Sequence, residues 1–366
     1  MVSVDGYGVR GARFPRLTRH ALLFILIPLI TLLTACGKAP EPLTHQESFV
    51  FGTRVEVLVY GETPEQGNAA AAEVLREFDR LHHAYHAWQP SELTALNDAI
   101  AAGRSHVVSI ELAALILTAQ RIAAQGDYLF DPGIGRLIGL WGFQNDEFKP
   151  QLPDPEKLQA WRVAHPSIAD LSVDGQRVTS RNRAVALDFG GYLKGVALDH
   201  AVALLKARGV HNALINIGGN VMALGSKGGK PWRVGIQHPR STAPLASLDL
   251  HDGEAIGTSG DYQRYFMLNG KRYCHLLDPR SAAPAQGTQA VTVLIPPGTD
   301  AGMRSDALSK PLFIAGTGWR EEARKLGVTQ ALRIDEAGTV FVTPALQDRL
   351  KLESGDVGSL RLVTVP

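Results

Sequence analysis

One stretch of the sequence, residues 187–225, holds several residues that could contact a ligand. Asp188 offers a carboxylate, and two glycine pairs follow it, Gly190-Gly191 and Gly218-Gly219. Because glycine has no Cβ, the backbone at such pairs can approach a bulky ligand closely. The pattern therefore indicates a binding site built from backbone groups and one acidic side chain. Glycine pairs also form plain turns, and on the pattern alone that alternative stays open.

A helix and a buried strand must position these residues. Apolar residues recur at helical spacing at four positions: Leu193, Ala197, Ala201 and Leu204. The spacing predicts a helix that ends at Gly209, and the apolar run 213–217 predicts a buried strand that ends at the second glycine pair. We expect Asp188 to close an earlier strand, so that two strand ends bring the glycine pairs to one face of a sheet.

A second segment, residues 256–284, contains a residue suited to proton transfer. Asn269-Gly270 lies between two alternating apolar runs and predicts a type I′ hairpin that pairs strands 264–268 and 272–277. His275 lies in the second of these strands, and imidazole titrates near neutral pH, which suits a catalytic acid or base. A histidine among apolar residues can equally be structural, and this alternative remains.

A third segment, residues 128–143, is rich in glycine and aromatic residues. Its glycines miss the spacing of the dinucleotide-binding fingerprint, so we reject a Rossmann site. Earlier in the chain, we predict one strand over residues 49–60 and a helix over residues 68–88. Trp88, at the end of this helix, is either an aromatic that stacks on a ligand or a core residue.

Taken in order, these segments resemble the ApbE family of FAD:protein FMN transferases. The matching motifs are LDFGGYLKGVALD with NIGG, FDPGIGRLIGLWGF, TSGDYQRYF and HLLDPR. The resemblance extends over essentially the whole mature chain. It implies an α+β fold: a single domain with a mixed β-sheet flanked by helices, and a flavin site at the strand ends.

The resemblance also implies an activity. This is magnesium-dependent transfer of the FMN part of FAD to a Ser or Thr hydroxyl of an exported acceptor protein, with release of AMP. FAD is then a substrate, and Mg²⁺ positions its pyrophosphate and neutralises charge on the leaving phosphate. Two alternatives remain open: a lipid-anchored protein that binds or hydrolyses FAD without transferring FMN, and a structural lipoprotein that binds nothing.

The resemblance assigns roles to particular side chains. The residues expected to bind FAD are Phe51, Trp88, Leu129, Phe130, Asp131, Asp188 and Lys194. His275 is the expected proton acceptor, with Asp306 as the second choice. Phe51 stands where the family usually has methionine, and one residue fewer than usual separates Trp88 from the Ser91-Glu92-Leu93 group.

The expected magnesium ligands are Asp306, the carbonyl of Gly191 and residue 310. The family pattern places Thr or Ser four residues after the aspartate, whereas this chain has Lys310, followed by Pro311. Magnesium prefers oxygen ligands, and an ammonium group cannot serve as one. We expect a backbone carbonyl or water in its place and the Lys310 ammonium against the pyrophosphate, with Pro311 disfavouring helical geometry at Lys310.

The first 35 residues have the pattern of a secretory leader, in which four arginines precede an uncharged apolar run over residues 21–33. The end of this run resembles a bacterial lipobox, in which Cys36 becomes the lipidated N-terminus. A plain signal peptide or an uncleaved anchor is the alternative. We predict a signal peptide over residues 1–35, a tether over 36–46 and one domain over 47–366, held by lipid on the periplasmic side of the bacterial inner membrane.

The composition is that of an ordinary soluble globular protein, with 45% hydrophobic and 20% charged residues among 366. The net charge is +1, and no basic patch with interleaved aromatic residues is present, so nucleic acid is not an expected partner. Apart from Cys36, the sequence has one cysteine, Cys274, which excludes a disulfide framework in the mature chain and a cysteine-rich metal site.

Overall fold

The computed structural model describes residues 42–145, 147–352 and 362–364. The expected leader, Cys36 and the first part of the expected tether lie outside these residues. No helix within them is long and apolar enough to cross a membrane. The predicted tether is too long, because its last four residues already belong to strand β1 (Leu43–Val50). Cys274 is buried and forms no disulfide within the described part of the chain.

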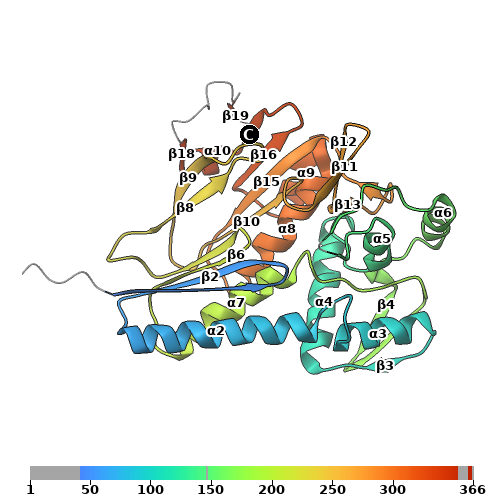
Figure 1. The fold of residues 1–366 in the computed structure, drawn as a ribbon, viewed down its shortest axis with the longest axis horizontal. Helices are drawn as coiled ribbons and strands as arrows, with labels where there is room; N and C mark the ends of the chain where they lie inside the picture. Colours follow the sequence, from blue (N-terminus) through green and yellow to red (C-terminus); the bar gives the residue numbers. More distant parts are fainter. Residues whose placement is uncertain (1–41, 146, 353–361, 365–366) are drawn as a thin grey trace, which may run out of the picture. The chain divides into compact units, whose positions relative to one another are not determined.

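The centre of the fold is a nine-stranded sheet with the strand order β1-β2-β6-β7-β10-β15-β16-β17-β19 (Figure 1). The strands after β1 are β2 (Thr53–Tyr60), β6 (Ala213–Ile217), β7 (Asn220–Leu224), β10 (Ala255–Gly260), β15 (Thr288–Ile295), β16 (Ala331–Asp335), β17 (Val340–Val342) and β19 (Leu362–Thr364). Neighbouring strands run antiparallel except β17 and β19, which run parallel. The sheet is therefore mixed, as expected.

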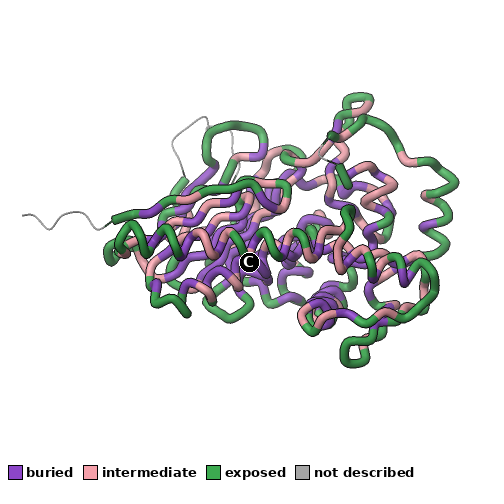
Figure 2. Tube along the Cα trace, turned by 60° about the horizontal axis from the view of Figure 1, so that its bottom comes forward, coloured by how far each residue is buried: buried purple, intermediate pink, exposed green. Residues whose placement is uncertain are grey.

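Three helices cover one face of this sheet: α2 (Pro64–Ala84), α7 (Leu193–Ala207) and α8 (Ala301–Ala315). Successive side chains of a strand point to opposite faces, so alternate residues of β2 serve different cores. Val55, Val57 and Val59 pack in the core with the helices, whereas Leu58 and Tyr60 contact the core on the other face. Along β2, buried residues alternate with partly exposed ones, and Figure 2 shows the buried part of the chain gathered in the interior, with exposed segments around it.

A second, three-stranded sheet packs on the other face of the central sheet. Its strands, in the order β18-β9-β8, are β8 (Trp232–Gln237), β9 (Pro244–Leu250) and β18 (Leu350–Leu352). Trp232 and Leu248 from this sheet share a core with Ile256 and Leu294 of the central one. Strand β15 lies between the two cores and is buried along its whole length, so the centre of the sheet gives the site a rigid support.

The remaining elements form one side of the site and the periphery. The helices are α3 (Glu92–Ala101), α4 (Ile110–Gln125), α5 (Gly135–Leu140), α6 (Pro155–Ala164), η2 (Ile168–Asp170), η3 (Gly316–Gly318), α9 (Trp319–Lys325) and α10 (Pro344–Gln347). The strands are β3 (His106–Val107), β4 (Leu171–Asp174), β5 (Arg177–Ser180), β11 (Tyr265–Leu268), β12 (Lys271–Cys274), β13 (Leu277–Asp278) and β14 (Ala283–Pro284). Helices α5 and α6 share a small core with the β11–β12 hairpin.

Several elements confirm the sequence predictions. Helix α7 and strand β6 have the predicted positions. The predicted hairpin is present as β11 and β12, and its turn residues Asn269 and Gly270 have φ of 52° and 74°. Both values are positive, as a type I′ turn requires.

Other elements differ from the predictions. Residues 49–60 form the end of β1, a tight turn and β2, because Phe51 and Gly52 adopt φ of 57° and 69° and reverse the chain. Asp188 does not close a strand; it lies in an extended segment whose pairing is the isolated bridge between Ala186 and Ile134. Helix α8 continues through Lys310 and Pro311. Its close packing against the sheet and α7 outweighs the backbone hydrogen bond that proline cannot make.

Candidate functional site

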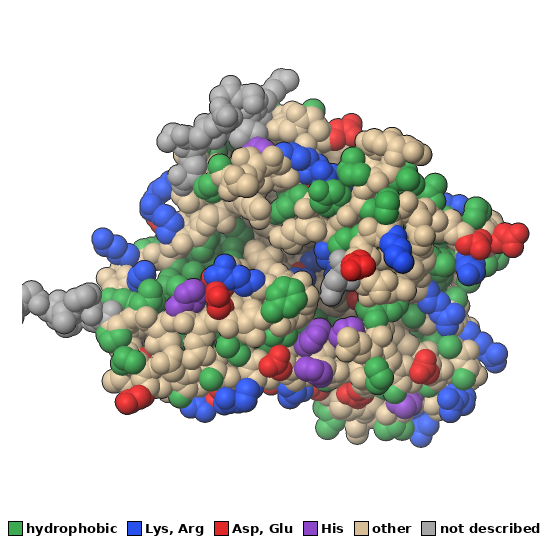
Figure 3. Space-filling model, viewed as in Figure 1, with side chains coloured by type: hydrophobic (Ala, Val, Ile, Leu, Met, Phe, Trp, Pro, Cys, Tyr) green, Lys and Arg blue, Asp and Glu red, His purple; other side chains and the backbone are tan. Residues whose placement is uncertain are grey.

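A cleft of about 980 Å³ opens beside the end of the central sheet, and it contains all the side chains that the sequence predicts for the site. Figure 3 shows a hollow in the surface with a group of histidine side chains beside it. The β1–β2 turn, the β6–β7 turn, the start of α7, the middle of α8 and the loop before α5 supply its walls. This volume is at the upper end of the range for small-molecule sites, so it suits a large ligand such as a dinucleotide.

Both glycine pairs reach this cleft. Gly190 and Gly191 lie in the turn before α7, and Gly218 lies in the turn between β6 and β7. A Cβ on Gly218 would approach the Thr53 hydroxyl oxygen to 2.6 Å, and φ at this residue is +58°. A side chain at this position would therefore be strained. The prediction that the glycine pairs meet at one site is confirmed, although only the second pair follows a strand.

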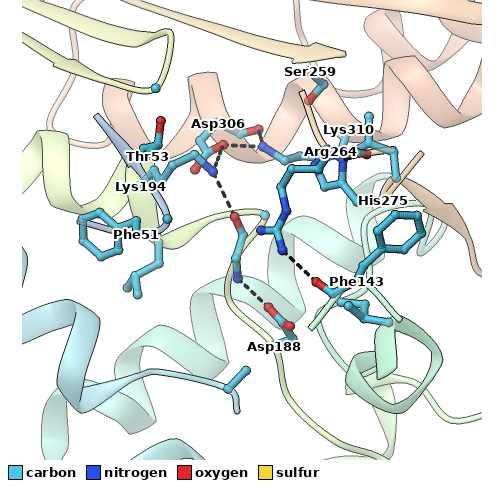
Figure 4. Close-up of a pocket in the computed structure, with 18 of the residues that line it drawn as sticks. Phe51, Thr53, Phe143, Asp188, Lys194, Ser259, Arg264, His275, Asp306 and Lys310 are labelled. Atoms are coloured by element: carbon cyan, nitrogen blue, oxygen red, sulfur yellow. Dashed lines mark hydrogen bonds and ion pairs between the residues drawn. The ribbon is translucent and has the colours of Figure 1, made fainter. Parts of the chain in front are cut away.

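The floor of the cleft is an ion-pair cluster of Asp306, Lys310 and Lys194 (Figure 4). The Lys310 ammonium donates to the Asp306 carboxylate Oδ1 and, at 2.7 Å, to the Asp306 backbone carbonyl. Lys194 Nζ lies 3.8 Å from Asp306 Oδ1 and donates to the Gly190 carbonyl at 3.0 Å. The backbone N–H of Gly195 donates to Asp306 Oδ2 at 3.0 Å. Both carboxylate oxygens of Asp306 therefore have donors.

These contacts keep the cluster ionised. Burial alone would raise the pKa of Asp306, but Lys194 and Lys310 outweigh it and bring this pKa to about 2. Burial lowers the pKa of Lys310 to about 8, and the attraction of Asp306 limits the fall. At neutral pH, Asp306 is an anion and Lys310 is mainly a cation.

The residues present do not fit a magnesium ion at this position. The Lys310 ammonium already occupies the side of Asp306 that an ion would use, and Lys310 Cε lies 3.4 Å from the position of a Cβ on Gly191. The lysine stem therefore lies beside Gly191, the other expected ligand. Two unit charges of like sign 4 Å apart repel by about 4 kcal/mol at an effective dielectric of 20, and a divalent ion would be repelled more strongly.

His275 has a defined tautomer. Its Nδ1 lies 3.2 Å from the carbonyl oxygen of Arg264. Because a carbonyl oxygen can only accept, Nδ1 carries the proton and Nε2 keeps its lone pair. The ring also makes an edge contact with Phe143, with the centroids 6.4 Å apart. The lone pair on Nε2 of His275 is therefore available to accept a proton.

The pKa of His275 lies below the near-neutral value that the sequence led us to expect. Burial of the ring lowers its pKa to about 3, and the positive charges of Arg264 and Lys194 add to this effect. The imidazole is consequently neutral at physiological pH. A bound dianion beside these cations would raise the pKa of His275, because opposite charge favours the protonated form.

Aromatic and apolar residues form the opposite wall. Phe51, Trp88, Leu129 and Phe130 all line the cleft. Trp88 has 39% of its surface exposed, so the alternative that it is a core residue is wrong. Phe51 packs against the ring of His82, with the centroids 5.6 Å apart and the planes nearly perpendicular. This wall offers flat surfaces on which a ring system can stack.

Asp131 and Asp188 also line the cleft, but their carboxylates hold the local backbone. Asp131 Oδ1 accepts from the N–H groups of Gly133 and Ile168 at 2.8 and 2.9 Å. Asp188 Oδ1 accepts from the N–H of Gly190 at 2.7 Å. Burial raises the pKa of both carboxyls, and these backbone hydrogen bonds oppose the rise. Each therefore shapes a loop of the site; contact of either with FAD stays a prediction.

One cleft residue that the sequence predictions did not single out is Arg264. Its guanidinium donates to the carbonyl of Phe143 at 2.7 Å and lines the cleft next to His275 (Figure 4). The signal was present, because Arg264 belongs to the TSGDYQRYF motif. Its place in the cleft depends on the packing of the β11–β12 hairpin against α5, which the motif does not show. Arg264 adds a third cation to the polar side of the cleft.

The fold and the cleft together define a class: an α+β protein with a cationic floor, an aromatic wall and a proton acceptor, suited to a phosphorylated ring compound. The model of the ApbE family matches residues 51–332. The chain belongs to the ApbE family.

Two curated relatives and one solved structure illustrate the match. A protein of Rhodobacter capsulatus named FAD:protein FMN transferase is 38% identical over 330 residues, which is 90% of this chain and 62% of the relative. A Klebsiella pneumoniae protein of the same name is 30% identical over 324 residues, or 84% of this chain and 90% of the relative. The crystal structure of the ApbE protein of Thermotoga maritima has a TM-score of 0.77 and 29% identity, covering 84% of this chain and 99% of that one.

These findings confirm the predicted family and the α+β fold. They also confirm the predicted enzyme class at the level of the family, because both relatives are named as flavin transferases. The chain spans 62% of the length of the Rhodobacter capsulatus relative, so that relative contains sequence with no counterpart here.

Proposed function

We propose that this protein transfers the FMN part of FAD to a Ser or Thr hydroxyl of an exported acceptor protein and releases AMP. The observation that carries the proposal is the cleft, in which a neutral His275 faces a floor of fixed cations. The names of the relatives support the same reaction. The aromatic wall supports binding of the isoalloxazine ring, and the glycine turns leave room for the phosphates.

In the proposed reaction, the acceptor oxygen forms a bond to the FMN phosphorus, and the bond from this phosphorus to the AMP oxygen breaks. The hydroxyl proton passes to Nε2 of His275, and AMP leaves with the electron pair. Arg264, Lys194 and Lys310 stabilise the charge on the phosphates. Asp306 is the weaker candidate for the proton acceptor, because both of its carboxylate oxygens already accept hydrogen bonds, from Lys310 and from Gly195.

The magnesium ion that the resemblance implies is assigned to no step of this reaction. Its expected ligands were Gly191, Asp306 and residue 310, and Lys310 holds Asp306 in an ion pair. Magnesium dependence therefore stays an expectation of the resemblance that the geometry of this chain does not support.

We also propose that the protein is held by lipid on Cys36 at the periplasmic side of the inner membrane. The pattern of the leader and the position of Cys36 support this proposal. Replacing Cys36 by Ser should release processed protein from the membrane fraction or leave the leader uncleaved. Processed mature protein that still sediments with membranes would contradict lipidation at Cys36.

The transfer is tested by the intact mass of an acceptor protein incubated with FAD and this protein. We expect the acceptor to gain the mass of FMN less one water, as a phosphoester requires, and to keep its flavin after denaturation. His275→Ala should slow transfer by about 10²–10⁴-fold while FAD still binds, because it removes the proton acceptor. His211→Ala, at an exposed position outside the cleft, is the matched control.

The outcomes separate the alternatives that the sequence left open. FAD that binds, or breaks down to FMN and AMP, without modifying any acceptor would favour a binding or hydrolysing protein. Calorimetry should show much tighter binding of FAD than of FMN. Equal affinities would indicate that the adenylate half is not recognised, which would contradict a transferase that releases AMP.

A further inference from the structure

Lys310 places a positive charge on the side of Asp306 that faces the cleft. We propose that the Lys310 ammonium replaces a divalent metal ion in this protein, so that FAD binds and reacts without a metal. The inference rests on the proposed function and adds to it the identity of the cation that contacts the pyrophosphate.

The lysine is built into the floor of the cleft. Lys310 lies four residues after Asp306 on α8, so both side chains leave the same face of the helix. Only 8% of the surface of Lys310 is exposed, and Asp306 is fully buried. An ammonium has three N–H donors, and Asp306 accepts two of them, through its carboxylate and its carbonyl. Among the residues that the structure describes, none accepts the third N–H, which is left for a ligand of the cleft that Lys310 lines.

The surroundings fix the ammonium before any ligand arrives. Asp306 is held by the N–H of Gly195, and the Ser309 hydroxyl donates to the Asp306 carbonyl at 2.8 Å. Ser309 is joined in turn to Ser259 of β10 by a hydrogen bond of 2.7 Å. The lysine stem lies beside Gly191. A cation fixed in this way costs little ordering when the pyrophosphate binds.

The charges of the site match the ligand without a metal. Asp306 and Lys310 form a neutral pair, and Lys194 and Arg264 add two positive charges to the cleft. A pyrophosphate diester carries two negative charges, with which Lys194 and Arg264 can pair; Asp131 and Asp188 also line the cleft, where their carboxylates accept from backbone N–H groups. Figure 4 shows the side chains of Asp306, Lys310, Lys194 and Arg264 around one space. A divalent ion would have to displace Lys310 and would then lie close to two ammonium groups, those of Lys310 and Lys194.

The first experiment uses the full-length protein after removal of metals with EDTA. FAD affinity is measured by calorimetry with EDTA and with excess Mg²⁺, and bound Mn²⁺ is measured by electron paramagnetic resonance. We expect FAD affinities within about twofold of each other, and no more bound Mn²⁺ than FAD alone binds in a protein-free control. A tenfold gain in FAD affinity with Mg²⁺, or one equivalent of protein-bound Mn²⁺, would overturn the proposal.

The second experiment asks whether the lysine is what excludes the metal. Lys310→Thr frees the Asp306 carboxylate and adds a hydroxyl oxygen, so FAD should bind at least tenfold more weakly in EDTA and recover with Mg²⁺. Lys310→Met keeps the length of the side chain but has neither a charge nor an oxygen atom. Its FAD affinity should therefore fall as well and should stay low when Mg²⁺ is added. Lys351→Thr, at an exposed lysine paired with Asp249, is the matched control and should behave as the wild type.

If Lys310→Thr binds FAD in EDTA as tightly as the wild type, Lys310 does not contribute to FAD binding and the proposal is overturned. If that variant does not fold, the wild-type measurements with Mg²⁺ and Mn²⁺ decide alone. Transfer assays separate the two proposals. Metal-independent FAD binding without FMN transfer would refute the function and keep this inference, whereas transfer that requires Mg²⁺ would keep the function and refute this inference.

Discussion

Two aspartates between α7 and α8 have the same local task and opposite electrostatics. Asp199 of α7 accepts from the N–H groups of Gly302 and Met303, in the first turn of α8, at 2.8 and 2.9 Å. Asp306 of α8 accepts from the N–H of Gly195, in the first turn of α7. Each aspartate therefore caps the N-terminus of the other helix.

This reciprocal capping replaces the usual local caps. Within the described part of the chain, the residues before α7 and α8, Tyr192 and Asp300, make no side-chain capping hydrogen bond. The two helices also approach closely, because a Cβ on Gly195 would lie 2.4 Å from the carbonyl oxygen of Gly302. The pair of aspartates thus fixes how α7 and α8 pack, and through them the floor of the cleft.

The difference lies in what else contacts each carboxylate. Burial raises the pKa of Asp199 to about 7, and its two backbone partners only partly oppose this. Burial acts on Asp306 in the same direction, but Lys194 and Lys310 bring its pKa to about 2. Backbone amides are enough for a structural cap. A carboxylate that must hold a cation at neutral pH needs ammonium partners.

The comparison is tested most strongly at Asp306. Asp306→Ala leaves the buried Lys310 ammonium without its counterion, so we expect a loss of about 3–5 kcal/mol in the free energy of unfolding. The double variant Asp306→Ala with Lys310→Met removes both charges, so its free energy of unfolding should fall clearly less than that of the single variant. Denaturant unfolding measures both.

Asp249→Ala is the control for this prediction, because it removes a more exposed carboxylate that pairs with Arg233 and Lys351. Its loss should be much smaller, since exposed ion pairs contribute little. Equal losses in the Asp306 single and double variants would mean that Asp306 and Lys310 are not coupled.

Much of the site was predictable because its residues lie in short, regular patterns. The spacing of apolar residues gave α7 and β6, and Asn269-Gly270 gave the hairpin next to His275. The glycine pairs met in one cleft, as expected. For the helix, the strand and the hairpin, neighbours in the sequence decide the conformation, so the local pattern is sufficient.

The features that were missed depend on contacts between distant segments. The β1–β2 turn has phenylalanine at φ of 57°, a conformation that this residue type rarely adopts, so Gly52 alone signals the turn in the sequence. The low pKa of His275 depends first on burial of its ring by the fold and then on the charges of Arg264 and Lys194. The hydrogen bond from Gly302 to Asp199 joins residues 103 apart in the chain. Periodicity does not contain such information.

At Asp199, we expect a smaller effect that is confined to stability. Asp199→Ala removes the acceptor for two N–H groups at the start of α8, so the free energy of unfolding should fall by about 1–2 kcal/mol, as for the loss of an N-cap. FAD affinity of the folded protein should stay within about twofold of the wild type, because Asp199 lies outside the cleft. A large loss of FAD affinity with unchanged stability would place Asp199 in the site and would contradict its role as a purely structural cap.

The last prediction concerns the pH dependence of the free energy of unfolding at Asp199. The pKa of Asp199 is about 7 in the folded protein and about 4 in the unfolded chain. The folded state therefore binds more protons between these values, and the stability that Asp199 contributes is full below about pH 4 and is lost as pH rises through about 7. Between these values the slope should approach, and cannot exceed, about 1.4 kcal/mol per pH unit, the value that one full proton gives.

Asp199→Asn removes this titration while keeping an oxygen acceptor for the first turn of α8. The stability difference between wild type and Asp199→Asn should fall steadily from about pH 4 to about pH 7. The matching difference for Asp306→Asn should stay level over that range, because the pKa of Asp306 is lowered to about 2 and its contribution is lost only as pH falls from about 4. A difference for Asp199→Asn that rises with pH would show that backbone amides alone hold Asp199 as an anion, and the two aspartates would then be electrostatically alike.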